Sequence, residues 1–207
     1  KKEGSLDSKQ AIAMGYRASA ENKNTIAIGS VGEDVTKATG ESAIAIGNGA
    51  QTTGSKAMGL GENVRATGEN SIAIGSKAKN GRADDTETKA YGSNAVALGS
   101  GANSNNWSVA VGGNAKALGD TSVAMGDRAL SIGANSTALG SGAQTGYEVR
   151  KTNNNKTVEY SGASYSVALG NAAKVYSNYS IAIGNKATVG ETQETNGEIS
   201  LAKDAVA

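Results

Sequence analysis

The stretch "VAVGGNAKALGDTSVAMGDRALSIGANSTALGSGA", residues 109–143, divides into five consecutive segments of seven residues. The fourth position of every segment is a glycine: Gly112, Gly119, Gly126, Gly133 and Gly140. A period of seven is typical of a coiled coil, but each of these glycines would destabilise a helix by about 1 kcal/mol relative to alanine. The pattern therefore indicates a repeating structure that is not helical.

The same pattern extends along most of the chain as an aliphatic residue, Ala, a second aliphatic residue and Gly, with a step of 14 residues in its most regular parts. Short segments of this kind, bounded by glycine, are typical of strands and turns. Strands this short become stable when they stack at about 4.8 Å per coil. We therefore predict an all-β protein, a parallel β-roll with two strands and two tight turns in each coil of about 14 residues.

Side-chain direction follows from the alternation of residues along each strand. The second strand of a coil reads small, polar, small, as in Ala115-Lys116-Ala117 and Ala173-Lys174-Val175. If the polar residue faces water, the small residues face a narrow interior, and the first strand must also turn its alanine inward. The aliphatic residues on either side of that alanine then point outward.

The outward aliphatic residues predict an oligomer interface, because a soluble monomer rarely exposes so long an apolar stripe. Each large side chain that is fully buried contributes about 1.5 kcal/mol or more. The predicted interface residues are Ile26, Ile28, Ile44, Ile46, Ile72, Ile74, Val96, Leu98, Val109, Val111, Val167, Leu169, Ile181 and Ile183.

Composition narrows the possible functions. The 207 residues have a net charge of +1 and include no Cys, His, Pro or Phe. Without a basic block, nucleic-acid binding is not expected, and without histidine the Ser-His-Asp and zinc-histidine chemistries are unavailable. The acidic pairs Glu33-Asp34 and Asp84-Asp85 lack a calcium-loop pattern and are interpreted as solvated turns. We expect no enzyme activity, no metal and no cofactor.

The segments "SIAIG", "AVALGSGA" and "SVAMGDRA", repeated at 14 residues over about 10–190, resemble the YadA-like head of bacterial trimeric autotransporter adhesins. The resemblance implies a left-handed β-roll in a homotrimer, displayed on the bacterial cell surface. Such proteins are anchored in the outer membrane by a C-terminal barrel, which is missing from this sequence. The family's heads bind host collagen, fibronectin or epithelial receptors of the carcinoembryonic-antigen type. The resemblance therefore implies an adhesin; the alternative is a spacer that binds nothing and projects another adhesive domain.

We interpret 1–207 as a single head domain in which 191–207 ends the head or begins a neck. Inserts interrupt the repeat at about 30–40, 79–92 and 146–162. The last insert alternates on both sides of an Asn run and predicts a β-hairpin, with strands at Tyr147–Thr152 and Lys156–Tyr160. This hairpin is either a flap that braces a neighbouring subunit or a finger that contacts ligand.

Candidate ligand-binding residues are those that break the polar outer pattern, since aromatic and apolar anchors dominate binding energy. Trp107 is either a plug between chains or an exposed anchor. The tyrosines of 147–179 either cover the hairpin or form a hot spot, and the two aliphatic residues at 130 and 132 contact either a ligand or an adjacent chain. The full set is Trp107, Leu130, Ile132, Tyr147, Tyr160, Tyr165, Tyr176 and Tyr179.

Overall fold

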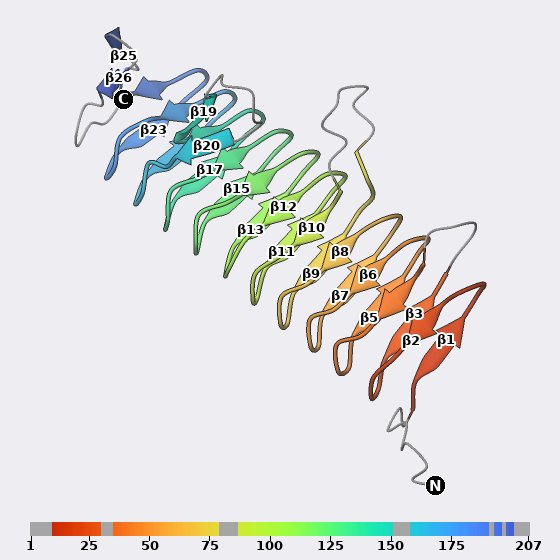
Figure 1. Ribbon diagram of the computed structural model, residues 1–207. Coiled ribbons are helices and arrows are strands. Elements are labelled where there is room, and N and C mark those ends of the chain that lie inside the picture. Colours follow the sequence, from red (N-terminus) through yellow and green to blue (C-terminus); the bar gives the residue numbers. More distant parts are fainter. Residues whose placement is uncertain are drawn as a thin grey trace, which may run out of the picture. The chain divides into compact units, whose positions relative to one another are not determined.

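The computed structural model describes residues 10–29, 35–78, 87–150, 158–190, 193–195 and 198–200. The chain forms two compact units, Lys1–Asn103 and Ser104–Ala207. Each unit is a stack of coils in which two sheets, each made of parallel strands, face each other (Figure 1). The predicted all-β parallel roll is confirmed.

In the first unit, one sheet consists of three-residue strands with outward aliphatic side chains and is called the aliphatic sheet. Its strands are β1 (Ile12–Met14), β3 (Ile26–Ile28), β5 (Ile44–Ile46), β7 (Met58–Leu60), β9 (Ile72–Ile74) and β11 (Val96–Leu98). The other sheet, called the polar sheet, contains β2 (Ser19–Ala20), β4 (Lys37–Ala38), β6 (Gln51–Thr52), β8 (Arg65–Ala66) and β10 (Lys89–Ala90).

The second unit repeats this arrangement, and β12 (Asn103–Ser104) lies at the boundary between the units. Its aliphatic sheet contains β13 (Val109–Val111), β15 (Val123–Met125), β17 (Thr137–Leu139), β21 (Val167–Leu169) and β23 (Ile181–Ile183). Its polar sheet contains β14 (Lys116–Ala117), β16 (Leu130–Ser131), β18 (Gln144–Thr145), β22 (Lys174–Val175) and β24 (Thr188–Val189). The register pairs Val109 with Val123, so one coil takes 14 residues.

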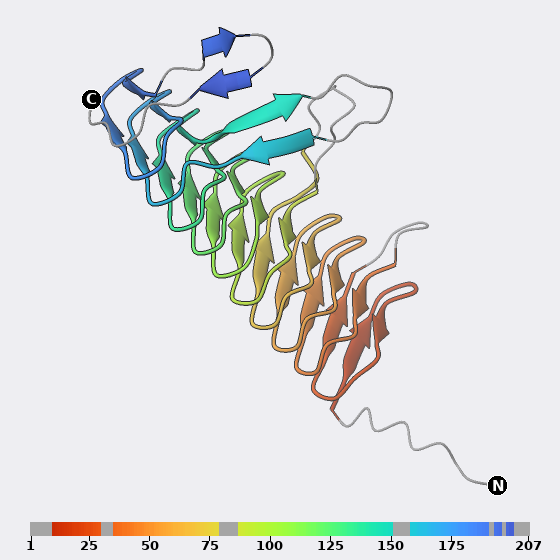
Figure 2. The same ribbon diagram turned by 60° about the vertical axis from the view of Figure 1, so that its left-hand side comes forward.

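Two antiparallel pairs depart from the coils. The pair of β19 (Tyr147–Arg150) and β20 (Val158–Ser161) confirms the predicted hairpin strands, although the turn proposed at 153–155 lies outside the described residues. This hairpin stands out from the coils of the second unit (Figure 2). The other pair is β25 (Gln193–Thr195) with β26 (Glu198–Ser200).

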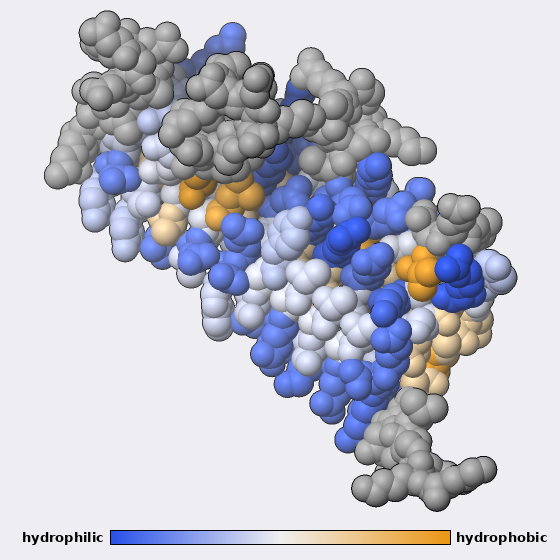
Figure 3. Space-filling model, in the orientation of Figure 1, coloured by the Kyte–Doolittle hydropathy of each residue, from blue (hydrophilic) through white to orange (hydrophobic). Residues whose placement is uncertain are grey.

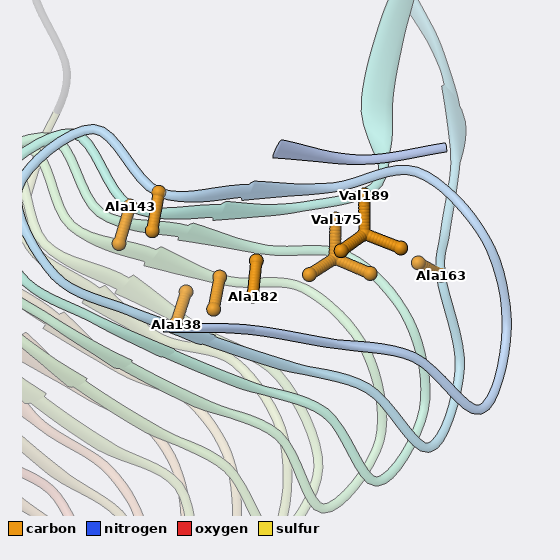
Figure 4. Packing of buried hydrophobic residues seen from close by; sticks show 8 residues of the cluster. Ala138, Ala143, Ala163, Val175, Ala182 and Val189 are labelled. Atoms are coloured by element: carbon orange, nitrogen blue, oxygen red, sulfur yellow. The ribbon is translucent and has the colours of Figure 1, made fainter. Parts of the chain in front are cut away.

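The interior is as narrow as the sequence predicts. From β3 onward the central residue of each aliphatic strand is a buried alanine, except in β7, where it is Gly59. The small residues of the polar strands face these alanines across the interior, as Val175 faces Ala182 (Figure 4). The first coil departs from this rule, because Ala13 is exposed. Among the described residues only one neighbouring coil packs against it.

Buried hydroxyl groups fill the remaining width near the turns. Ser131, Ser136 and Thr145 form a closed set of hydrogen bonds, with oxygen–oxygen distances of 2.7, 2.9 and 3.1 Å. Each hydroxyl therefore has a partner inside the roll, as buried polar groups require.

Close stacking of the coils requires glycine after each aliphatic strand. At Gly126 the backbone has φ of 132°, and an added Cβ would collide with the carbonyl oxygen of Gly140 in the next coil. Gly184 has nearly the same φ of 130°, but a Cβ there would meet only the Cβ of Ala187 at 3.8 Å. The difference arises because Gly184 belongs to the last coil that the structure describes.

Candidate functional site

The predicted functional residues lie on three different surfaces. The first is the outer face of the aliphatic sheet, where large side chains flank buried alanines. Ile46, Ile74 and Leu169 are each 37% exposed, while Ala45, Ala73 and Ala168 between them and their neighbours are fully buried. The inward and outward assignments made from the sequence are therefore correct for these strands.

The aliphatic face is more continuous than the sequence analysis predicted. Its register also includes Met58, Leu60, Val123, Met125 and Leu139, which lie beside the predicted residues in adjacent strands. These residues could have been found from the 14-residue step alone, because they occupy the same positions in other copies of the repeat, both regular (Val123, Met125) and less regular (Met58, Leu60, Leu139). In the single chain, nothing described covers this face.

The second surface is the outer face of the polar sheet, which carries ion pairs in the first unit. Lys37 contacts Glu21 at 3.0 Å. The carboxylate of Glu87 lies 2.8 Å from Arg65 Nε and 3.2 Å from Lys89 Nζ. This face is well solvated and charged, and it offers few anchors to an apolar partner.

Electrostatics on this face follow from those contacts. The hydrogen bond from Lys37 holds the pKa of Glu21 below its ordinary value. Burial alone would lower the pKa of Lys89, but hydrogen bonds to Tyr91 and Glu87 outweigh it and raise the pKa. The ammonium group of Lys89 also lies 5.5 Å from the centre of the Tyr91 ring. Lys89 therefore remains charged at neutral pH.

In the second unit the same face becomes apolar, in what we call the apolar patch: Leu118, Leu130, Ile132, Tyr147 and Tyr176, all half-buried. Leu130 stands in register between Lys116 and Gln144. The ring of Tyr147 meets that of Tyr176 edge to face, with 6.1 Å between centroids. On the face seen in Figure 3, hydrophobic colour lies among the coils of the second unit and also on the first coils of the first unit.

Backbone hydrogen bonds order the patch. Leu118 N donates to Ser131 O and Ile132 N donates to Thr145 O, so these residues hold the same position in successive coils. In the next two coils the same position is held by Gly146 and then by Tyr176. Because Gly146 has no side chain, the adjacent Tyr147 contributes the side chain of that coil to the patch. Leu118 was not predicted as a candidate. The signal that could have found it is its place one coil before Ile132.

The third surface is a column of turn residues between the polar and aliphatic sheets of the second unit, which we call the aromatic edge: Trp107, Thr121, Asn135, Tyr165 and Tyr179. The turns that carry them are linked coil to coil by N–H···O bonds of 3.0–3.1 Å. Tyr165 and Tyr179 stack with 5.2 Å between ring centroids and 6° between planes. The structure thus divides the predicted ligand residues between the apolar patch and the aromatic edge.

Some predicted features lie outside what the structure describes. These are the side chain of Tyr160 and the acidic residues Glu33, Asp34, Asp84 and Asp85. Among the described residues, no three acidic, histidine or cysteine side chains cluster as a metal site would require. The same described residues contain no helix that is long and apolar enough to cross a membrane.

Comparison with known proteins agrees with this geometry. The YadA head domain repeat matches residues 8–30, 38–61, 53–78, 86–105, 108–129 and 162–187. Among solved structures, the chain is similar to the collagen-binding domain of the Yersinia adhesin YadA, with 22% sequence identity and a TM-score of 0.50. The similarity covers 89% of this chain and 80% of that one, and at this identity it concerns the fold. No curated protein matches the chain.

Proposed function

The chain belongs to the family of YadA head domain repeats, and on that premise we propose that it is the head of a trimeric adhesin on a bacterial cell surface. Its proposed role is to bind a protein of the host extracellular matrix or an epithelial receptor. Collagen is the first candidate, because the similar Yersinia domain binds collagen. Fibronectin and receptors of the carcinoembryonic-antigen type are further candidates. The role is one of binding rather than catalysis.

The aliphatic face supports the trimer. It presents paired aliphatic side chains in successive strands. In a single chain these side chains are partly exposed to water. Three copies that turn this face toward a common three-fold axis would bury these side chains against one another in a closed ring. In such an assembly the polar sheets and the turns face outward, where a ligand can reach them.

The apolar patch is the observation that best supports a protein ligand. Leu130 occupies a position that is Lys116 in one neighbouring strand and Gln144 in the other. Replacing solvated residues by half-buried aliphatic and aromatic groups creates area that a partner can desolvate, and tyrosine is enriched among binding hot spots. The two rings of Tyr147 and Tyr176, already in contact, add a rigid anchor to that area.

Substitutions that restore the repeat test this proposal with little risk to folding. Leu130→Lys copies Lys116, and Ile132→Thr copies the threonine at 39, 53 and 67 in the first unit. We expect each variant to bind immobilised collagen, fibronectin or receptor at least tenfold more weakly, with an unchanged melting temperature. Gln51→Leu, on the polar sheet of the first unit, is the matched control and should bind like the wild type.

The spacer alternative makes a different prediction. A head that only projects another domain would bind none of these proteins, and its variants at the apolar patch would be indistinguishable from the wild type. Absence of saturable binding to every candidate protein would therefore favour the spacer. Binding that survives both Leu130→Lys and Ile132→Thr would keep the adhesin but move its ligand site away from the apolar patch.

A further inference from the structure

The backbone of the aromatic edge is unusual for the side chains it carries. Trp107, Tyr165 and Tyr179 each have φ of 55°, in the left-handed region. Bulky side chains are rare there, whereas asparagine is enriched. In the other coils this turn position carries polar residues with φ of 53–66°: Gln10, Asn24, Ser42, Lys56, Asn70, Asn94, Thr121 and Asn135. Three aromatic residues thus stand where the other coils carry polar side chains.

Packing inside the chain does not account for these aromatic residues. Trp107 is 63% exposed, Tyr165 56% and Tyr179 60%. Large aromatic side chains that the chain leaves exposed point to a role in recognition, because aromatic residues are enriched among binding hot spots. Because Tyr165 and Tyr179 already stack on each other, a ligand would lose little entropy in ordering them.

The edge is straight, narrow and polar between its rings. Trp107 and Tyr179 are four coil steps apart, through Thr121, Asn135 and Tyr165, which at about 4.8 Å per step gives a length of about 19 Å. Between the aromatic residues, the hydroxyl of Thr121 donates to Asn135 Oδ1 at 2.6 Å. The preceding position in each turn carries Asn106, Asp120, Ala134, Ser164 and Asn178. Three aromatic rings, a threonine hydroxyl and an asparagine carboxamide therefore lie along a single line.

We propose that the aromatic edge is a second binding site, for a neutral linear glycan that lies along the stacked coils. Sugar rings present C–H faces that pack on aromatic side chains and hydroxyl groups that pair with amides and hydroxyls, which is the mixture found here. An extended chain of β-linked sugars matches a straight line of turns. The ligand is neutral because the edge and the positions before it hold one carboxylate, Asp120, and no lysine or arginine.

A protein ligand fits this edge less well than the apolar patch. Protein hot spots lie in well-packed pockets from which water is excluded, whereas Trp107, Tyr165 and Tyr179 are each more than half exposed. A glycan can pack its C–H faces on these exposed rings and place its hydroxyl groups beside the amides and hydroxyls of the edge. The proposal adds a ligand class and a surface to the function proposed above, and does not depend on the matrix protein.

The test uses Trp107, the only tryptophan of the chain, as its own reporter. Cellohexaose, N-acetylchitohexaose and a poly-N-acetyllactosamine hexasaccharide are titrated into the assembled protein while tryptophan fluorescence and heat of binding are measured. We expect a saturable change with at least one of them. Trp107→Asn, Tyr165→Asn and Tyr179→Asn should each weaken that binding at least tenfold by calorimetry, while the melting temperature stays the same or rises.

The controls separate this site from others. Tyr16→Asn removes a tyrosine that is 70% exposed on a turn of the first unit, and it should bind glycan like the wild type. Leu130→Lys should also keep glycan binding, even if it loses the matrix protein. Three results would overturn the proposal: no saturable binding to any of the three oligosaccharides, full binding by the asparagine variants, or a fall in their assembled mass, which would make the edge a contact between subunits.

Discussion

Replacing Gly126 by alanine tests whether coil stacking, rather than backbone conformation alone, demands glycine after each aliphatic strand. The Cβ of an alanine would collide with the carbonyl oxygen of Gly140 in the next coil. Gly184→Ala is the matched control, because its φ of 130° is nearly that of Gly126, and its Cβ would meet only Ala187 at 3.8 Å. Both variants carry the same backbone strain, of about 1–3 kcal/mol.

Only Gly126→Ala must also push two coils apart. The N–H of Gly126 donates to Val111 O and that of Gly140 to Met125 O, each at 2.8 Å. Weakening one or two such bonds costs about 0.5–1.5 kcal/mol each, and overpacking adds about 1–3 kcal/mol. We therefore expect Gly126→Ala to lower the free energy of unfolding by about 2–4 kcal/mol more than Gly184→Ala does.

The measurement is denaturant unfolding followed by far-UV circular dichroism. All samples are compared at one protein concentration, because association stabilises the folded chain by mass action. If the two variants lose equal stability, the stacking argument is wrong and the positive φ alone explains the glycines.

Three further predictions concern the interior, the assembly and pH. Ala73→Leu should lower the free energy of unfolding by about 1–3 kcal/mol, because the side chain of Ala73 is fully buried in an interior only as wide as an alanine. Gln51→Leu on the outer face is the control and should change the free energy of unfolding by less than about 0.5 kcal/mol. Equal melting temperatures of the two variants would contradict the assigned faces. Ile74→Lys should reduce the mass measured by light scattering from three chains toward one, whereas an unchanged mass would place the interface elsewhere. Lys37→Met should raise the pKa of Glu21, measured by carboxyl NMR, toward its ordinary value, because the lysine hydrogen bond lowers it. Since the folded pKa is the lower one, that contact stabilises the fold above the unfolded pKa and is lost as pH falls through the folded pKa; a pKa that does not respond would show that the contact is absent in solution.

Much of the fold could be predicted from the sequence because the repeat encodes it twice, in the spacing of the glycines and in the alternation around each alanine. The inward alanines and the outward aliphatic pairs follow from that pattern, and the hairpin strands follow from the alternation on both sides of the Asn run in the insert. Ala13 was misassigned because burial at an end of the stack depends on how many coils cover it, which the local pattern does not contain.

The division of the candidate site could not be predicted. In the sequence, Tyr176 and Tyr179 are three residues apart and look like one cluster. In the structure, Tyr176 joins the apolar patch and Tyr179 the aromatic edge, because the turn between them changes the direction of the chain. Likewise, Asn135 and Tyr165 become neighbours in the aromatic edge only when the hairpin is left out of the count of residues per coil.

The strand pairs of each unit join one coil to the next, and this gives the stack a definite response to tension. A force that pulls the end coils of a unit apart acts on these hydrogen bonds one coil at a time. Each coil that peels away shortens the stack by about 4.8 Å but releases 14 residues, or roughly 48 Å of extended chain. With no cysteine in the sequence, no disulfide limits this extension. A unit held between two surfaces would therefore lengthen in steps of one coil under load. Each released coil would lower the tension on the bond between the unit and its ligand.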